Sequence, residues 1–166
     1  MKIQFITLRA VTRAGGFTAH YSEKGLAKLE FPKVPPASAR TATITIPAAA
    51  GVRGWHRQTQ AALNRVLAGR APGKFPPLDL RGTDFQKSVW NALRKIKTGR
   101  TKSYGEIARI IGRPRAVRAV GGACGANPVP VLIPCHRVLA ADQQLGGFSG
   151  GLEWKRTLLA REGVKF

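Results

Sequence analysis

The chain has 166 residues, of which 43% are hydrophobic, and its 28 Lys and Arg against 8 Asp and Glu give a net charge of +20. No apolar run approaches the roughly 18 residues that a membrane span requires. Arg9 and Arg13 also interrupt the apolar N-terminal stretch, so we expect no signal peptide. These features favour a cytoplasmic protein (nucleoid-associated if the source is prokaryotic) with one large or two small domains.

The positive charge is spread along the whole chain. Residues 1–77 hold 12 basic and 2 acidic residues, and residues 78–166 hold 16 and 6, so each half carries +10. This excludes a basic tail attached to a neutral domain. A field of this sign favours a polyanionic partner, with nucleic acid as the first candidate. A solvated basic surface and attraction to anionic lipid are the alternatives.

The first 46 residues alternate between apolar and polar in short runs, which predicts strands at 3–11, 17–22, 26–31 and 42–46. Residues 55–70 then have the apolar periodicity of a helix, with Gly69 near its end. The Pro- and Gly-rich stretch 71–82 predicts a domain boundary near residue 77. We therefore expect an N-terminal domain over 1–77 and a C-terminal domain over 78–166.

The C-terminal half begins with three predicted helices. Residues 83–96 have helical apolar spacing, with Thr83 or Asp84 as the N-cap. A second helix follows Ser103, which forms a capping-box pattern with Glu106, and ends at Gly112. A third is expected from Pro114 to residue 126. Two short helices joined by a tight turn predict a helix-turn-helix.

The third helix is expected to have two different faces. Val117, Val120 and Cys124 would pack inward, while the outward face is small apart from its arginines and is formed by Arg115, Arg118, Ala119, Gly122 and Ala126. Arginine with small residues suits a narrow groove in which phosphates and shape are recognised. The alternative is an ordinary Ala-rich helix packed against the other domain.

Cys135 and His136 are the candidate reactive pair. Residues 129–139 read as a buried strand, in which neighbouring side chains would point to opposite faces, but Pro134 interrupts regular pairing. A turn would let both side chains face one cavity, where the imidazole takes the thiol proton directly or through a water. Glu162, at the end of the last predicted helix, could reach back to orient the imidazole. The alternative is a buried thiol that merely precedes a histidine.

A glycine-rich loop follows the pair at residues 145–151. Its glycines would let a flat ligand approach the backbone, with Phe148 available for stacking and Ser149 for a hydrogen bond. The alternative is a plain hinge before the last helix. The two cysteines lie in no C-x-x-C motif and the three histidines are scattered, so we expect reduced thiols and no metal site.

Residues 78–166 resemble the catalytic domain of the O6-alkylguanine-DNA alkyltransferases. The matching segments are "LDLRGTDFQKSVWNAL", "SYGEIARIIGRPRAVRAVGGACGANPVPVLIPCHRV" and "GGFSGG" followed by a lysine and "LLAREG". The resemblance implies an α+β fold: a small N-terminal antiparallel sheet plus helix (RNase H-like), then a mainly helical winged-helix-like domain containing a helix-turn-helix. It also implies DNA repair by irreversible, single-turnover transfer of an alkyl group from guanine O6, with thymine O4 as an open alternative, after the nucleotide flips out.

The resemblance also implies roles for individual residues. Cys135 would accept the alkyl group, His136 would act through water as its base with Glu162 orienting the ring, and Asn127 would hold the turn before the active-site segment. Tyr104 would contact the DNA backbone and donate a proton toward guanine N3, and Arg118 would fill the gap left by the extruded base. The remaining expected residues are Arg113, Arg115, Ala119 and Gly122 for DNA binding and Val138, Pro130, Phe148 and Ser149 for the substrate pocket.

The implied partner is double-stranded DNA containing alkylated guanine, approached through the minor groove by a monomer with no cofactor and no membrane association. The chain departs from the family pattern at Phe148, where a tyrosine is usual, so a hydroxyl is lost. The segment at 78–86 also resembles bacterial adaptive-response proteins, whose zinc-binding cysteine domain is not expected here. Two other classes remain open: a non-catalytic DNA-binding protein and a Cys-His hydrolase of acyl substrates.

Overall fold

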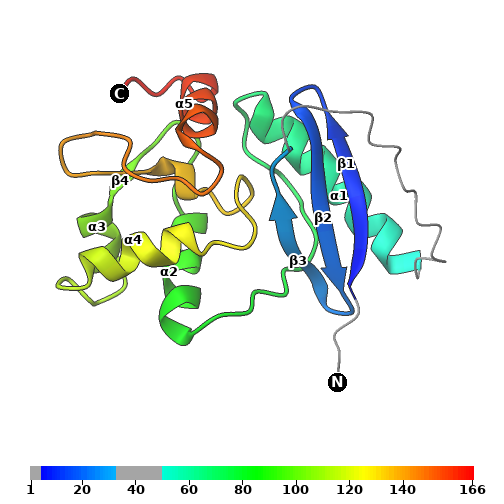
Figure 1. The fold of residues 1–166 in the computed structure, drawn as a ribbon, viewed down its shortest axis with the longest axis horizontal. Coiled ribbons are helices and arrows are strands. Elements are labelled where there is room, and N and C mark those ends of the chain that lie inside the picture. The colour runs from blue at the N-terminus through cyan, green and yellow to red at the C-terminus, as the bar shows by residue number, and fades with distance from the viewer. Residues whose placement is uncertain (1–4, 33–49) are drawn as a thin grey trace.

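A computed structural model describes residues 5–32 and 50–166 of the chain. Figure 1 shows a sheet with one helix across its face beside a group of shorter helices. This arrangement confirms the α+β class, with the small antiparallel sheet preceding the helical unit. The strand expected at 42–46, and the first two residues of the one expected from residue 3, lie outside the described residues.

The sheet has three antiparallel strands in the order β1 (Ile6–Thr12), β2 (Gly15–Ser22) and β3 (Gly25–Glu30). Alternation along β2 buries Phe17, Ala19 and Tyr21 beneath α1 (Ala50–Leu67) and the C-terminal unit. The helix begins five residues earlier than predicted, because Val52 extends its buried face by one turn.

The outer edge of β3 joins the sheet to the rest of the chain. The Leu26 amide donates to the carbonyl of Pro77 at 2.8 Å, and Leu26 forms a parallel bridge with Leu78. The Leu29 amide donates to the carbonyl of Pro128 at 2.8 Å. These bonds satisfy backbone groups that an exposed edge strand would leave unpaired, and they attach the sheet directly to the segment before Cys135.

The helical unit contains α2 (Asp84–Arg94), α3 (Tyr104–Ile110), α4 (Val117–Gly125) and α5 (Leu152–Arg161). Thr83 is the N-cap of α2, completing a capping box with Gln86, and Ser103 forms the predicted box with Glu106. The Trp90 indole of α2 donates to the Ala123 carbonyl of α4 at 2.8 Å. The helix-turn-helix predicted from capping and periodicity is therefore present as α3 and α4.

The predicted start of the third helix was wrong. The helix α4 begins at Val117, because the Arg113 amide donates to Ala108 and the Ala116 amide to Arg113, which makes residues 113–116 a turn. Val117 was also expected to pack inward, but it is 40% exposed at the first turn. Val120 and Cys124 are buried as predicted.

The strand predicted over residues 129–139 was also wrong in its first part. Every residue from 129 to 139 is buried, but Val131 has a φ of +74° and Cys135–Arg137 form a short 3-10 helix, η1. Only β5 (Val138–Leu139) is extended, and it pairs in parallel with β4 (Lys102–Ser103). Pro130 and Pro134 remove two ladder donors from the segment, and Pro128 precedes it, so a buried apolar run here is an irregular core segment.

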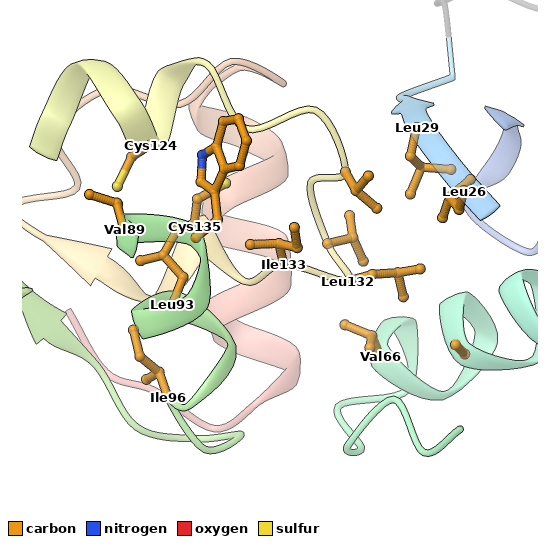
Figure 2. Close-up of a cluster of buried hydrophobic side chains, with 14 of the residues drawn as sticks. Leu26, Leu29, Val66, Val89, Leu93, Ile96, Cys124, Leu132, Ile133 and Cys135 are labelled. Carbon is orange, nitrogen blue, oxygen red and sulfur yellow. The ribbon is translucent and has the colours of Figure 1, made fainter. Parts of the chain in front are cut away.

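One hydrophobic core connects the two units. Figure 2 shows Leu132 and Ile133 between the side chains of α2 on one side and those of β3 and α1 on the other. The segment that precedes Cys135 therefore lies inside the protein, and its position depends on both units. Within the described ranges, no helix has the length and apolar character needed to cross a bilayer.

Candidate active site

Asn127 fixes the position of Cys135. Its side-chain amide donates to the Ile133 carbonyl at 2.8 Å and to the Cys135 Sγ at 3.1 Å, and its carbonyl oxygen accepts from the Val129 amide at 3.0 Å. One buried amide therefore closes the loop between α4 and η1 and also points a donor at the sulfur. Cys135 itself is 4% exposed.

His136 forms a buried pair with Glu162. The His136 Nε2 lies 3.0 Å from Glu162 Oε1, and both side chains are at most 1% exposed. Burial opposes ionisation of Glu162, but hydrogen bonds from His136 and Arg137 outweigh it and lower the carboxyl pKa to about 2. Because a carboxylate can only accept, Nε2 carries the proton and Nδ1 keeps its lone pair.

Nδ1 of His136 is the unusual atom of this pair. It is buried and makes no hydrogen bond to any group in the part of the chain that the structure describes. Burial lowers the pKa of His136, and the nearby Glu162 offsets this only in part, so the ring is neutral. A neutral imidazole with an unused, buried lone pair is equipped to accept a proton.

Arg137 holds Glu162 in place, a contact that the sequence reasoning missed. Its guanidinium donates to both carboxylate oxygens at 2.9–3.2 Å, to the Ile96 carbonyl at 2.5 Å and to the Thr98 hydroxyl at 3.1 Å. The Gly99 amide adds a further donor to Glu162 at 3.1 Å. Such bidentate, charge-assisted bonds restrict the carboxylate to one orientation, and through it the His136 ring.

Lys155 is a second missed residue. Its side chain is fully buried, and its ammonium donates to the carbonyl of Val138 at 2.6 Å and to that of Leu145. Burial lowers the pKa of Lys155, while Cys135 and Cys124 act in the opposite direction. A signal was available, because Lys155 shares the apolar face of its helix with Leu158 and Leu159.

The two thiols differ in their surroundings. Burial raises the pKa of Cys135 to about 11, against the hydrogen bond from Asn127 and the charge of Lys155. Burial raises the pKa of Cys124 further, to about 12, with Lys155 as the opposing charge. Both thiols are therefore protonated at rest, and Cys135 has more groups that favour its thiolate.

A cavity of about 530 Å³ opens onto Cys135. Its walls are Tyr104, Gly121, Cys124, Gly125, Cys135, Gly147, Phe148 and Ser149. Gly146 has a φ of +62°, and a Cβ there would lie 3.0 Å from the Tyr104 hydroxyl, so glycine lets the loop approach that ring. Burial raises the pKa of Tyr104, which keeps the phenol protonated and able to donate. The cavity thus offers two aromatic walls, flat glycine surfaces and one thiol with a nearby base.

Two of the four expected pocket residues are elsewhere. Phe148 and Ser149 line the cavity, whereas Val138 is fully buried and its carbonyl accepts from Lys155. Pro130 borders a different groove, between β3 and the Asn127 turn. Pro130 and Val138 therefore do not form the cavity wall in this structure.

The exposed side of α3 and α4 is basic. Arg113, Arg115 and Arg118 are exposed, as is Arg109 of α3, and none of the four forms an ion pair with a described residue. Ala119 and Gly122 are exposed beside them, and nothing lies within 4 Å of a Cβ placed on Gly122. This face can approach a polyanion closely, and Gly121 and Gly125 of the same helix line the cavity.

Known proteins share both the sequence and the fold. The family described as "6-O-methylguanine DNA methyltransferase, DNA binding domain" matches residues 84–164. A methylated-DNA–protein-cysteine methyltransferase from Mycolicibacterium paratuberculosis is 58% identical over 115 residues, or 66% of this chain and 70% of that protein. One from Haemophilus influenzae is 53% identical over 90 residues, which cover 54% of this chain and half of that protein.

The likeness extends to the N-terminal unit in a solved structure. Mycobacterium tuberculosis OGT, crystallised in complex with DNA, has a TM-score of 0.74 and 37% identity, covering 93% of this chain and 90% of that one. Sequence, fold and the buried thiol with its neighbours thus agree, and the chain belongs to the methylated-DNA–protein-cysteine methyltransferase family.

Proposed function

We propose that this protein repairs DNA by transferring an alkyl group from O6 of guanine to Cys135, once per molecule, after the nucleotide leaves the duplex. The observation that carries the proposal is the cavity of about 530 Å³, which is lined both by Cys135 and by the C-terminal half of α4, the helix that carries Arg118. O4 of thymine remains an alternative alkyl source. The family and the DNA-bound relative support DNA as the partner.

The buried network supports a path for the thiol proton. A water between Cys135 and His136 would pass the proton from Sγ to the unused Nδ1, while Glu162 stabilises the imidazolium that forms. The Asn127 amide and the Lys155 charge favour the resulting thiolate. Because the resting thiol has a pKa of about 11, the base is needed to produce the nucleophile near neutral pH.

The transfer itself balances without a cofactor. The thiolate attacks the alkyl carbon, the carbon–O6 bond breaks, and guanine leaves as it takes a proton at N3 from the Tyr104 hydroxyl, which lines the cavity. The proton that His136 took from the thiol then returns through solvent to the Tyr104 phenolate, so both groups end neutral. Ser149 lies at the cavity wall, where it can donate toward the O6 edge, and Phe148 can stack on the base. The product is a thioether, which no neighbouring group is suited to cleave, so each molecule reacts once.

The exposed arginines support minor-groove binding. Extruding a nucleotide costs a few kcal/mol of stacking and pairing. Arg118, exposed in the first turn of α4, would enter the stack and offset part of that loss, while Arg113 and Arg115 contact phosphates. Ala119 and Gly122 leave room for the backbone of the helix to approach the groove.

We further propose that residues 78–166 bind DNA and transfer the alkyl group, while residues 1–77 hold the segment from Asn127 to Val138 in place. The bond between Leu29 and Pro128 supports this division. We also expect a monomer, and a cytoplasmic location in which DNA is present.

Mass spectrometry after incubation with a duplex containing O6-methylguanine tests the proposal. We expect the Cys135 peptide to gain the mass of one methyl group, and the total transfer not to exceed one methyl group per protein molecule. Cys135→Ala should bind the same duplex without gaining mass. Tight binding by the wild type with an unmodified peptide would instead indicate a non-catalytic damage-binding protein, and ester turnover beyond one equivalent would indicate a hydrolase.

A further inference from the structure

The loop that carries Phe148 and Ser149 is a thin wall between two hollows. Ser149 lines the Cys135 cavity on one side, and on the other it lines a groove of about 880 Å³ between the loop and β3. The loop has little regular structure of its own between Gly146 and Gly151, since its internal backbone bond is the one from the Gly151 amide to the Phe148 carbonyl. Contacts from outside must therefore decide where this wall lies.

Phe31, just beyond the end of β3, supplies one such contact from the N-terminal unit. Its ring centroid lies 5.6 Å from that of Phe148 at an interplanar angle of 70°, an edge-to-face arrangement. It lies 5.1 Å from the ring of Trp154 in the first turn of α5 and 5.6 Å from that of Phe17. The loop is thus attached to the N-terminal sheet through one aromatic cluster, defined here as Phe17, Phe31, Phe148 and Trp154.

Gly150 shows how closely the ring is seated. A Cβ added at this position would overlap the Phe31 ring, although the backbone of Gly150 does not have a positive φ. Glycine is therefore needed for space rather than for conformation, because the aromatic ring rests directly on the backbone of the loop. Gly146 has the matching close approach to Tyr104 at the other end of the same wall.

The end of β3 is also linked, through two hydrogen bonds, to Cys135 itself. The Leu29 amide binds the carbonyl of Pro128, next to Asn127, whose side chain donates to Cys135 Sγ. Figure 1 shows β3 as the strand of the sheet that faces the C-terminal helices. Leu29 is thus linked to the segment that carries Cys135, and Phe31 contacts Phe148 of the cavity wall.

We propose that Phe31 is a positioning residue for alkyl transfer: by holding the loop through Phe148 and Gly150, it sets how closely the alkyl carbon is pressed toward Cys135. This inference rests on the proposed function. A small methyl group depends most on that closeness, because a displaced wall leaves it free to move away from the sulfur. A bulky benzyl group fills the widened cavity and depends on it less.

The test compares Phe31→Ala and the conservative Phe31→Tyr with Leu8→Ala, a half-buried residue of β1, which forms the opposite edge of the sheet from β3. Single-turnover rates are measured on one duplex carrying either O6-methylguanine or O6-benzylguanine. For Phe31→Ala the methyl rate should fall about tenfold or more, since misplacement by an ångström costs up to about 100-fold. The benzyl rate should fall clearly less. In Phe31→Tyr, which keeps an aromatic ring, both rates should stay near the wild-type values.

Hydrogen exchange of residues 146–151, measured on the full chain, gives a second readout that does not require transfer. Exchange should accelerate in Phe31→Ala and not in Leu8→Ala. An unchanged benzyl-to-methyl ratio, or equal changes in both variants, would overturn the proposal, because a merely structural loss affects both substrates alike. If the wild type transfers nothing, the proposed function fails, and the exchange data still decide whether Phe31 holds the loop.

Discussion

Helix α4 and the segment from Asn127 to Val138 follow one another in the chain but present opposite kinds of environment. The helix displays Arg118, Ala119 and Gly122 to solvent and has no side-chain cap. The segment is buried from residue 129 onward, and the polar groups of Asn127 and Arg137 are engaged in hydrogen bonds. On the proposed function, the helix contacts DNA and the segment positions the thiol. Substitutions in the helix should therefore affect DNA binding and repair in a duplex, whereas substitutions in the segment should affect alkyl transfer itself.

The largest separation is expected between the two thiols of the cavity. Cys135→Ser should abolish alkyl transfer, because a serine hydroxyl is a far weaker nucleophile than a thiol assisted by His136. Cys124→Ser should keep transfer near the wild-type rate, since Cys124 lacks the bonds that hold Cys135. Quantitative mass spectrometry of both cysteine peptides checks this. Methylation of Cys124 in the Cys135→Ser protein would contradict this prediction, because a thiol of α4 would then accept the methyl group without the bonds that hold Cys135.

Glu162→Gln should produce the next largest effect. The loss of the carboxylate removes the charge that stabilises the His136 imidazolium, and general-base assistance contributes about 100-fold or more to rate. Glu153→Gln, an exposed glutamate on α5, is the matched control and should leave the rate unchanged. DNA binding should be similar in both variants. A normal transfer rate in Glu162→Gln would show that the buried network is not part of the chemistry.

The same variant should change how stability depends on pH. In the native protein Glu162 has a pKa of about 2, against 4.5 in the unfolded chain, so its contribution is present above about pH 4.5 and is lost as the pH falls toward 2. The pKa of His136 is also lower in the native protein than its ordinary value of 6.5, so its contribution to stability is likewise lost as the pH falls below about 6.5. Urea unfolding between pH 7 and pH 3 should therefore show a shallower acid decline for Glu162→Gln than for Glu153→Gln.

Arg118→Ala should act on α4 alone. Repair of O6-alkylguanine in a duplex should slow by about tenfold to 100-fold, because unstacking costs a few kcal/mol and each 1.4 kcal/mol is a factor of ten. Reaction with free O6-benzylguanine should be unchanged, since no base has to be extruded. Equal losses with both substrates would mean that Arg118 supports the cavity rather than the DNA.

The smallest expected effect concerns the salt dependence of binding. If the four exposed arginines of α3, α4 and the turn between them contact phosphates, the logarithm of affinity should fall with the logarithm of salt at a slope of about −3 to −4. Arg115→Ala should reduce that slope by about 1, uniformly across sequences. Arg57→Ala, on the exposed face of α1, should leave it unaltered. An equal change in both variants would place the DNA contact over the whole basic surface instead.

Local features of this protein were predictable from the sequence because they depend on neighbours in the chain. The capping boxes at Thr83 and Ser103, the apolar stripes of α2 and α3, and the exposed small residues of α4 are all set by residues within four positions. The family motif around Cys135 was visible for the same reason. The start of α4 was not, because hydrogen bonds from Arg113 and Ala116 compete with the helix that Pro114 favours.

The backbone geometry of the segment from Asn127 to Val138 depended on the tertiary structure. A buried apolar run is compatible with a strand or an irregular core segment, and only Asn127, three prolines and packing against both units decide between them. The 26-residue separation of His136 and Glu162, and the partners of Arg137 and Lys155, likewise follow from how α5 packs on η1. The sequence by itself determined which groups are the candidates for the proposed chemistry. Burial and long-range hydrogen bonds, which no local pattern encodes, decided their protonation and orientation.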